Sequence, residues 1–296
     1  RRWVAARLSS VDFRRTSRSR FMMVLEWVAY AIVATFVVVR SRFGPRPDAF
    51  LRRLALLVVA SFLVEDTAIH AFGFYQYSPD WSVFVDQVPL AVLLIWPIVI
   101  HSSWELARAL LGSDHRAVPI AGGALVCADA SLIEPICSRA GLWSWNEPGL
   151  FDVPAIGILG WAFYASLCMV AFQWAEIRRA PRWEWACWLL APAGTHLLLL
   201  VAWWALFRWV NTPWPSWPIV GAAWCVSLGL MLHAWKTHAR QRIHPRDLLI
   251  RIPAALFFFV LLALRGRDDP ALVAYALAFA PPYLALMQNP RAWRWA

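Results

Sequence analysis

Residues 185–207 read WACWLLAPAGTHLLLLVAWWALF and include no Asp, Glu, Lys or Arg. As an α-helix this run is about 34 Å long, which exceeds the roughly 30 Å hydrocarbon core of a bilayer. The whole chain has the same character: 60% of its 296 residues are hydrophobic, 16% are charged, and the mean hydropathy is +0.52. A soluble domain averages about 45–50% apolar and about 25% charged residues. The composition therefore predicts an integral membrane protein and excludes the usual soluble-enzyme folds.

Apolar segments of this length recur along the chain and predict an all-α polytopic membrane protein with eight or nine transmembrane helices. The nine segments are 21–39, 51–71, 88–111, 117–137, 153–176, 185–207, 217–235, 248–264 and 271–288. We expect residues 21–296 to form a single transmembrane domain. Residues 1–20 contain seven Arg, and we expect them to form a basic arm that lies at the membrane interface.

The charges of the loops predict an orientation. Residues 40–53, 178–182 and 236–251 are rich in Arg, whereas 72–87 contain no Lys or Arg and 138–152 contain one Arg. Because basic loops stay on the cytoplasmic side, the first three should face the cytoplasm and the last two the opposite side, in a bacterial cytoplasmic membrane.

The basic arm conflicts with this orientation. If 21–39 crosses the membrane, the arm and the loop at 40–53 lie on opposite sides, and both are basic. A re-entrant first segment or a further helix upstream would each remove the conflict.

Anionic lipid headgroups explain clusters of Arg beside apolar segments, so the net charge of +10 predicts contact with the lipid bilayer and not nucleic-acid binding.

One pattern occurs twice: an acid, Gly seven positions later, an apolar-aromatic-x-aromatic element, Val-Pro, and Trp seven positions after that Pro. The first copy consists of Asp66, Gly73, Phe74-Tyr75-Gln76-Tyr77, Val88-Pro89 and Trp96. The second copy consists of Glu134, Gly141, Leu142-Trp143-Ser144-Trp145, Val153-Pro154 and Trp161. Each helix-loop-helix unit, about 58–111 and 126–176, makes two crossings. The units therefore share one orientation, related by an axis along the membrane normal, and their acids and aromatic rings should meet on one face.

Ionisable side chains inside membrane spans are costly, which makes them functional candidates. We expect the catalytic carboxyl groups to be Asp129, Glu134, Glu65 and Asp66. Hydrocarbon surroundings and like-charged neighbours favour a neutral carboxyl, which can act as a general acid. Aromatic faces stabilise a cation. The expected substrate-binding residues are Tyr75, Tyr77, Trp143, Trp145, Trp161, Phe74 and His70. Helix packing for the acids and interfacial anchoring for the aromatic residues are the competing interpretations.

Other chemistries have less support in the sequence. The seven His residues form no clusters of the kind that a membrane di-iron enzyme needs, so no metal site is predicted. No Asp-rich diphosphate motif, Gly-rich phosphate loop or G-x-S-x-G elbow occurs in the chain.

Residues 129–145, DASLIEPICSRAGLWSW, followed by Val153-Pro154 and Gly160-Trp161, resemble a known family. These are the integral-membrane carotenoid biosynthesis proteins, which include the carotenoid 1,2-hydratases and the bisanhydrobacterioruberin hydratase. Residues 72–77, FGFYQY, are similar to the first aromatic loop of that family.

The resemblance implies addition of water to the terminal C=C of an acyclic carotenoid, a long apolar isoprenoid, without an organic cofactor. It implies roles for Asp129 and Glu134, which match the acids before the Trp-x-Trp element, and for Glu65 before the first loop. The chain departs from the family at Gly157, where the family has Asn. Two alternatives stay open: a non-enzymatic subunit that binds a carotenoid or quinone or scaffolds a complex, and an enzyme like the lycopene cyclases.

Overall fold

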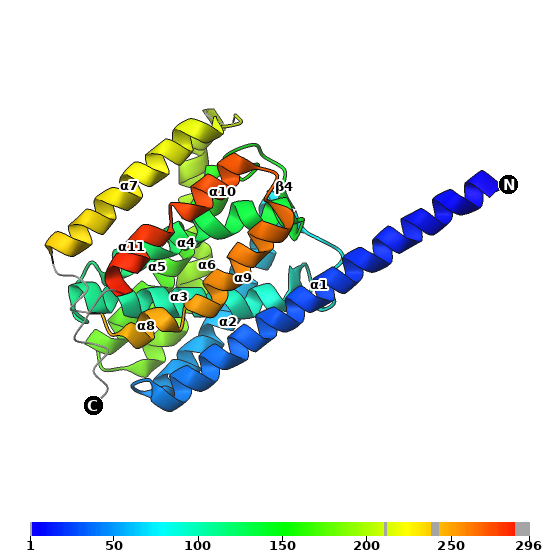
Figure 1. Ribbon diagram of the computed structural model, residues 1–296. Coiled ribbons are helices and arrows are strands. Elements are labelled where there is room, and N and C mark those ends of the chain that lie inside the picture. The colour runs from blue at the N-terminus through cyan, green and yellow to red at the C-terminus, as the bar shows by residue number, and fades with distance from the viewer. Residues whose placement is uncertain (1, 210–211, 238–242, 288–296) are drawn as a thin grey trace.

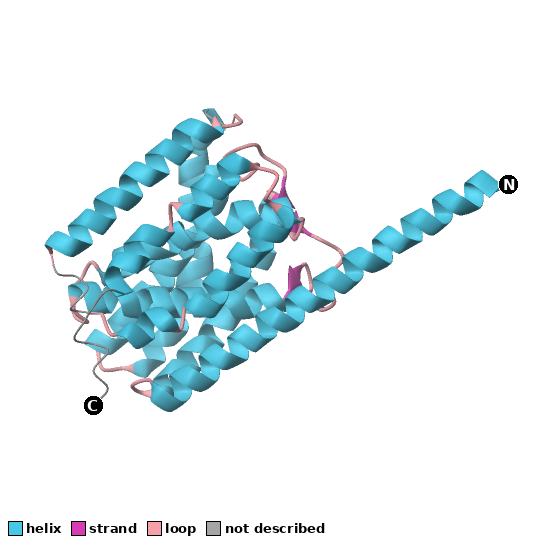
Figure 2. Ribbon diagram, in the orientation of Figure 1, coloured by secondary structure: helices cyan, strands magenta, loops and turns pink. Residues whose placement is uncertain are grey.

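The structure is a computed structural model that describes residues 2–209, 212–237 and 243–287. Its elements are α1 (Arg2–Phe43), α2 (Pro47–Phe72), β1 (Tyr75–Tyr77), β2 (Phe84–Val85), β3 (Val88–Pro89), α3 (Leu90–Leu111), α4 (Val118–Ala140), β4 (Trp143–Trp145), α5 (Ala155–Ile177), α6 (Cys187–Ala205), α7 (Ser216–Lys236), α8 (Pro245–Leu249), α9 (Ile252–Arg265), α10 (Pro270–Leu277) and α11 (Ala280–Met287), with 3-10 turns at Pro181–Ala186 and Phe207–Trp209. Helices dominate, and the short strands lie at one end of the bundle (Figures 1 and 2).

The predicted all-α membrane fold is confirmed. Within the described residues, nine helical segments are long and apolar enough to cross a membrane, and each contains or overlaps one of the nine predicted segments. The last prediction extended to residue 288, which lies outside the described residues, as do Arg1 and parts of the predicted basic loop (238–242) and domain (288–296).

The bundle has one central helix, α3, and an apolar outer surface. In α3, 78% of the most apolar window is buried, against 17% in α7, which lies along the outside (Figure 1). Large apolar side chains cover the outside; Leu189, Leu197 and Trp204 of α6 are 76%, 63% and 60% exposed. Exposing these apolar side chains to water would cost free energy, whereas contact with the hydrocarbon chains of lipids would not.

The two repeat units meet through their aromatic loops. Strands β1 and β4 pair antiparallel, with Tyr75 opposite Trp145 and Tyr77 opposite Trp143. Equivalent strands that pair in this way are related by a two-fold rotation. The equivalent rings of Trp96 and Trp161 stack on one another with centroids 3.4 Å apart. The loops 72–87 and 138–152 therefore lie at the same end, as the charge pattern predicts; we call it the aromatic end.

The Arg-rich loops meet at the other end, which we call the arginine end. Arg46, which precedes α2, reaches Glu176 in the last turn of α5 at 3.1 Å, and Arg52 in the second turn of α2 reaches Glu184 in the 3-10 turn after α5 at 2.7 Å. His244, before α8, lines the same pocket as Arg46. All three predicted basic loops thus contribute to one end of the bundle.

The first helix is continuous. α1 runs without a break from Arg2 to Phe43, and its first half extends beyond the bundle at the aromatic end (Figure 1). Residues 20–43 qualify as a membrane span. The first segment is therefore not re-entrant in this structure, and the role of residues 1–20 as an interfacial arm stays a prediction.

Candidate active site

A pocket at the aromatic end collects most of the predicted site residues. It lies between α2, α4, α5, α6 and the paired strands, and its cavity volume is about 60 Å³. Of the predicted residues, those that line it are Glu65, Phe74, Tyr75, Tyr77, Glu134, Trp143, Trp145 and Trp161. No Lys, Arg or His occurs among the lining residues that the structure describes. The two carboxyl groups therefore face the cavity without a basic partner.

Glu134 is held by three indole groups. Trp143 and Trp145 donate from Nε1 to its Oε2 at 2.8 and 3.2 Å, and Trp161 donates to its Oε1 at 2.9 Å. The side chain is only 2% exposed. Because an indole can donate but cannot accept a hydrogen bond, these three groups stabilise a carboxylate at this position.

Glu65 is held by two phenol groups in the corresponding position of the first repeat. Tyr75 and Tyr77 both donate to its Oε2, the latter at 2.9 Å. Its Oε1 takes no part in these two bonds. Burial raises the pKa of both tyrosines well above the ordinary value of 10.0, and the neighbouring Glu65 carboxyl adds to the effect. Both phenols therefore keep their protons and act as donors at neutral pH.

The contacts change the alignment of the repeats by one residue. The sequence pattern pairs Asp66 with Glu134, whereas the structure places Glu65, not Asp66, opposite the aromatic loop. One residue turns the side chain by about 100° around a helix. Asp66 therefore points away from the pocket, where its Oδ1 accepts a hydrogen bond from the backbone N–H of Gln87 at 3.4 Å.

His70 lies outside the pocket with Asp66. Its Nε2 is 2.9 Å from Asp86 Oδ2 and 3.8 Å from Asp66 Oδ1, and its side chain is 56% exposed. The hydrogen bond from His70 lowers the pKa of Asp86. These three residues place potential ligand atoms within 4.8 Å of one another, and they are the group of that kind found among the described residues. The prediction that the protein has no metal site stays untested.

Asp129 is also absent from the pocket, although it lies on the same helix as Glu134. Five residues along α4 turn the side chain to another face, where Arg251 Nη2 donates to Oδ2. Tyr283 donates to Oδ1 at 3.0 Å and Ser103 to Oδ2 at 3.3 Å. Of the two expected proton donors, Glu134 faces the aromatic cavity, whereas Asp129 lies on another face of α4 and forms an ion pair with Arg251.

Phe74 and the paired loops form the aromatic wall. Tyr75 lies 4.7 Å from Trp145 between ring centroids, and Tyr77 lies 5.8 Å from Trp143. Phe74 lines the pocket and packs 5.9 Å from Trp203 of α6. The predicted aromatic residues therefore meet around one cavity, with the stacked pair of Trp96 and Trp161 beside them.

Gly157, where the resembled family has Asn, lies against this wall. A Cβ built at Gly157 would overlap the ring of Trp145. The absence of a side chain at Gly157 therefore leaves room for the Trp145 ring beside α5, from where its Nε1 donates to Glu134. The departure at this position is compensated by the indole that fills the space.

Thr195 is a site residue that the sequence analysis missed. It lies on α6, is 1% exposed, and lines the pocket. Within the described part of the chain its Oγ1 is buried without a hydrogen-bond partner. A buried hydroxyl in this condition is costly unless a water molecule or a ligand satisfies it. Sequence offered no signal, because a single Thr in an apolar helix is common.

The chain matches a family of known proteins over most of its length. The family described as carotenoid biosynthesis protein matches residues 19–226, from the start of the first span to within α7. Neither a curated protein nor a solved structure gives a significant match. The match covers more than two thirds of the chain and includes both repeat units and the pocket that they form. This integral membrane protein therefore belongs to the carotenoid biosynthesis protein family.

Proposed function

We propose that the protein is a cofactor-independent carotenoid hydratase, which adds water to the terminal C=C of an acyclic carotenoid. The observation that carries the proposal is the carboxyl group of Glu134, which faces an aromatic cavity beneath three fixed indole donors. A second carboxyl group, Glu65, faces the same cavity. Family membership supports a role in carotenoid biosynthesis, and the chemistry of the pocket supports hydration within that role.

In the first step, protonated Glu134 gives its proton to the terminal alkene. Two carboxyl groups in one apolar cavity without a base favour a state with at most one negative charge. The three indole N–H groups already point at the Glu134 oxygens, so they stabilise the carboxylate that forms as the proton leaves. The proton bonds to the alkene carbon nearer the chain, and the positive charge forms on the carbon that carries the two methyl groups.

In the second step, the tertiary cation is held by π faces until water reaches it. The faces of Trp, Tyr and Phe rings attract cations, and the cavity offers all three kinds. Trp161 and Trp96 contribute a stacked pair next to Glu134. Because these rings are not bases, they stabilise the cation without removing a proton from it.

In the third step, water attacks the cation and Glu65 accepts the proton that the water loses. Thr195 Oγ1, which has no partner within the described residues, is placed to hold this water beside the cavity. The new C–O bond uses a lone pair of the water oxygen. Return of the proton from Glu65 to Glu134 through water or a tyrosine hydroxyl restores the starting state, so the reaction consumes one alkene and one water.

The test is pigment analysis in bacterial cells that make an acyclic carotenoid, with and without this gene. A product heavier by one water supports hydration. An isomer of unchanged mass would replace the proposal with cyclisation, and an unchanged pigment that copurifies with the protein would replace it with the binding or scaffold role.

Two variants assign the proton donor. Glu134→Gln should lower hydration by about a hundredfold or more, because general acid catalysis contributes that much. Glu26→Gln is the matched control: Glu26 is equally buried but accepts from the backbone N–H of Ser82 at 3.0 Å, away from the pocket. Full activity of Glu134→Gln would disprove the assignment.

A further inference from the structure

We propose that the polyene arm of the substrate lies in an internal channel that runs from the carboxyl pocket to a groove between α1, α3, α4, α9 and α11. This inference rests on the proposed function, because it assumes a long acyclic isoprenoid whose end reacts at Glu134. It assigns a second binding region to α1, α9 and α11, which contribute no residue to the carboxyl pocket.

Three cavities follow one another without a gap in their lining. Trp96 and Trp143 line both the carboxyl pocket and a middle cavity. Ile133 and Phe258 line both the middle cavity and the groove. The middle cavity is therefore adjacent to the carboxyl pocket on one side and to the groove on the other.

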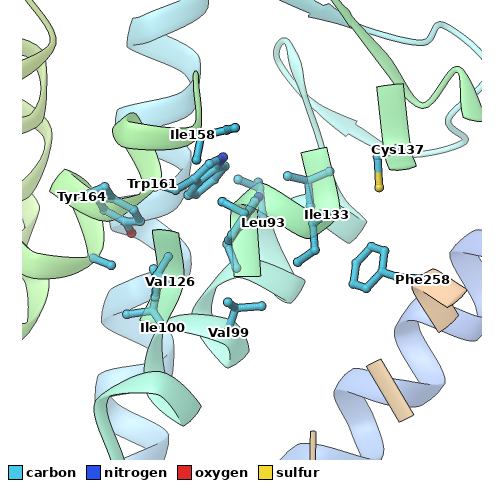
Figure 3. Packing of buried hydrophobic residues seen from close by; sticks show 14 of the residues in the cluster. Leu93, Val99, Ile100, Val126, Ile133, Cys137, Ile158, Trp161, Tyr164 and Phe258 are labelled. Atoms are coloured by element: carbon cyan, nitrogen blue, oxygen red, sulfur yellow. The ribbon is translucent and has the colours of Figure 1, made fainter. Parts of the chain in front are cut away.

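The middle cavity has the chemistry of a hydrocarbon passage. Its lining consists of apolar side chains, Cys137 and three Trp. Phe258 of α9 faces Ile133 and Cys137 of α4 (Figure 3). Its volume is about 30 Å³, against about 230 Å³ in the groove, so it is the narrow point of the path.

The groove also suits an apolar chain, although it contains charged residues. Arg251 donates to Asp129, to Tyr283 at 3.3 Å and to Ser102 at 2.8 Å. These groups satisfy one another and hold α9 and α11 against α3 and α4. From Arg251 to Phe258 the groove follows α9 for about 10 Å, the rise of seven helical residues. The polar cluster therefore serves as a fixed wall, and the remaining surface is apolar.

The groove also gives a role to the last helices. The family match ends at residue 226, before α9 and α11. These two helices contribute Ala255, Phe258 and Tyr283 to the lining. The far wall of the channel is therefore built from the part of the chain that follows the matched region, where a preference for one substrate length would be set.

The competing route leads sideways out of the pocket between α5 and α6, into the lipid. Gly160 and Leu199 line the pocket on that side, and a Cβ at Gly160 would lie 3.5 Å from Leu199, in ordinary contact. Continuity of the apolar lining favours the groove, and variants on the two routes distinguish them.

The experiment compares Ala255→Trp, which fills the groove, with Ala263→Trp on the same helix. Both positions are exposed, but Ala263 lines none of the four cavities. Each variant is expressed as the full chain and given a full-length acyclic carotenoid or a three-isoprene-unit hydrocarbon with the same end group. Ala255→Trp should lower conversion of the carotenoid at least about tenfold, since overpacking costs roughly that factor. It should leave conversion of the short hydrocarbon unchanged, which also shows that the variant folds.

Equal conversion of the carotenoid by Ala255→Trp and Ala263→Trp would overturn the channel, and loss of conversion in Gly160→Leu alone would replace it with the sideways route. Failure of the proposed function looks different: the unmodified protein would then form no hydrate from either substrate. Pigment that copurifies with Ala263→Trp but not with Ala255→Trp would support the channel even in that case.

Discussion

At the residue scale, six carboxyl groups of the membrane spans fall into two kinds by their partners. Glu105, Glu176, Glu184 and Asp129 each pair with Arg. Glu134 and Glu65 instead receive hydrogen bonds from indole and phenol groups. An ion pair removes a carboxyl group from proton transfer, since its charged form is already stabilised. Among these six carboxyl groups, only Glu65 and Glu134 combine burial, neutral hydrogen-bond donors and a position facing the carboxyl pocket.

The unpartnered hydroxyl of Thr195 leads to a prediction that separates function from packing. Thr195→Val keeps the shape of the side chain and removes Oγ1. If this atom holds the reacting water, hydration should fall about tenfold, the value of one hydrogen bond. The thermal unfolding temperature should not fall, because the substitution removes a buried polar atom without a protein partner. The readouts are product formed per molecule of enzyme and thermal unfolding in detergent.

Thr35→Val is the matched control for this experiment. Thr35 also lies in a membrane span, but its Oγ1 donates to the carbonyl oxygen of Ala31 at 2.8 Å and is remote from the pocket. The Thr35→Val variant should leave hydration unchanged. A fully active Thr195→Val enzyme would remove Thr195 from the mechanism while leaving Glu134 and Glu65 in place.

The sequence alone could predict Glu134 as a site residue, but it could not decide between Glu65 and Asp66. Glu134 and the Trp-x-Trp element belong to a pattern that occurs twice in the sequence, and the repetition marks these positions as candidates for the site. The choice between Glu65 and Asp66 needed the actual rotation of α2, which adjacent acids do not reveal. The ion pair of Asp129 was also hidden from the sequence, because its partner Arg251 lies 122 positions away.

At the element scale, the aromatic loops depend on the left-handed residues that end α2 and α4. Gly73 has φ +60° and Gly141 has φ +75°, and each follows the last residue of its helix. This conformation turns the chain at once into β1 or β4, so the Tyr and Trp side chains reach back to the carboxyl groups one to three turns earlier. The two equivalent turns therefore bring both carboxyl groups and both aromatic loops to one pocket.

Gly73→Ala should destabilise the protein by about 1–2 kcal/mol, the cost of a left-handed conformation for a residue with Cβ. A Cβ at Gly73 meets nothing within 4 Å, so the backbone conformation alone sets this cost. Gly73→Asn should cost less, because Asn tolerates this region better. Unfolding in a detergent titration measures both. Gly229→Ala, also in open space but inside α7, should not destabilise the protein; equal effects at the two glycines would refute the argument.

The helices themselves could be predicted closely because length and apolarity decide them. Predicted and observed spans differ mainly at their ends, where local capping takes over. Asp269 shows the effect: its side chain accepts from the N–H groups of Ala271 and Leu272 at 3.1 Å and starts α10. Hydropathy also does not show that one predicted segment, 271–288, consists of two helices, α10 and α11.

At the scale of the whole molecule, the two ends of the bundle have opposite characters. The arginine end combines Arg46, Arg52, Arg53 and Arg108 with Glu176 and Glu184. The aromatic end has the paired loops and the carboxyl pocket. The predicted orientation, with the basic loops in the cytoplasm, would put the pocket in the non-cytoplasmic half of the membrane. The described part of the arm, residues 2–20 with six Arg, lies on the side of the aromatic end and favours the reverse orientation (Figure 1).

Labelling of single cysteines decides between these two orientations. Val83→Cys lies at the aromatic end and Asp114→Cys at the arginine end, and both side chains are exposed. The background carries Cys225→Ser, since Cys225 is the exposed native thiol among the described residues. We expect a membrane-impermeant thiol reagent to label Val83→Cys in intact cells and Asp114→Cys only after the membranes are opened. Three clustered basic loops should outweigh one basic arm, because the bias sums over short loops near the spans. The reverse labelling would show that the arm dominates and would move the pocket to the cytoplasmic half.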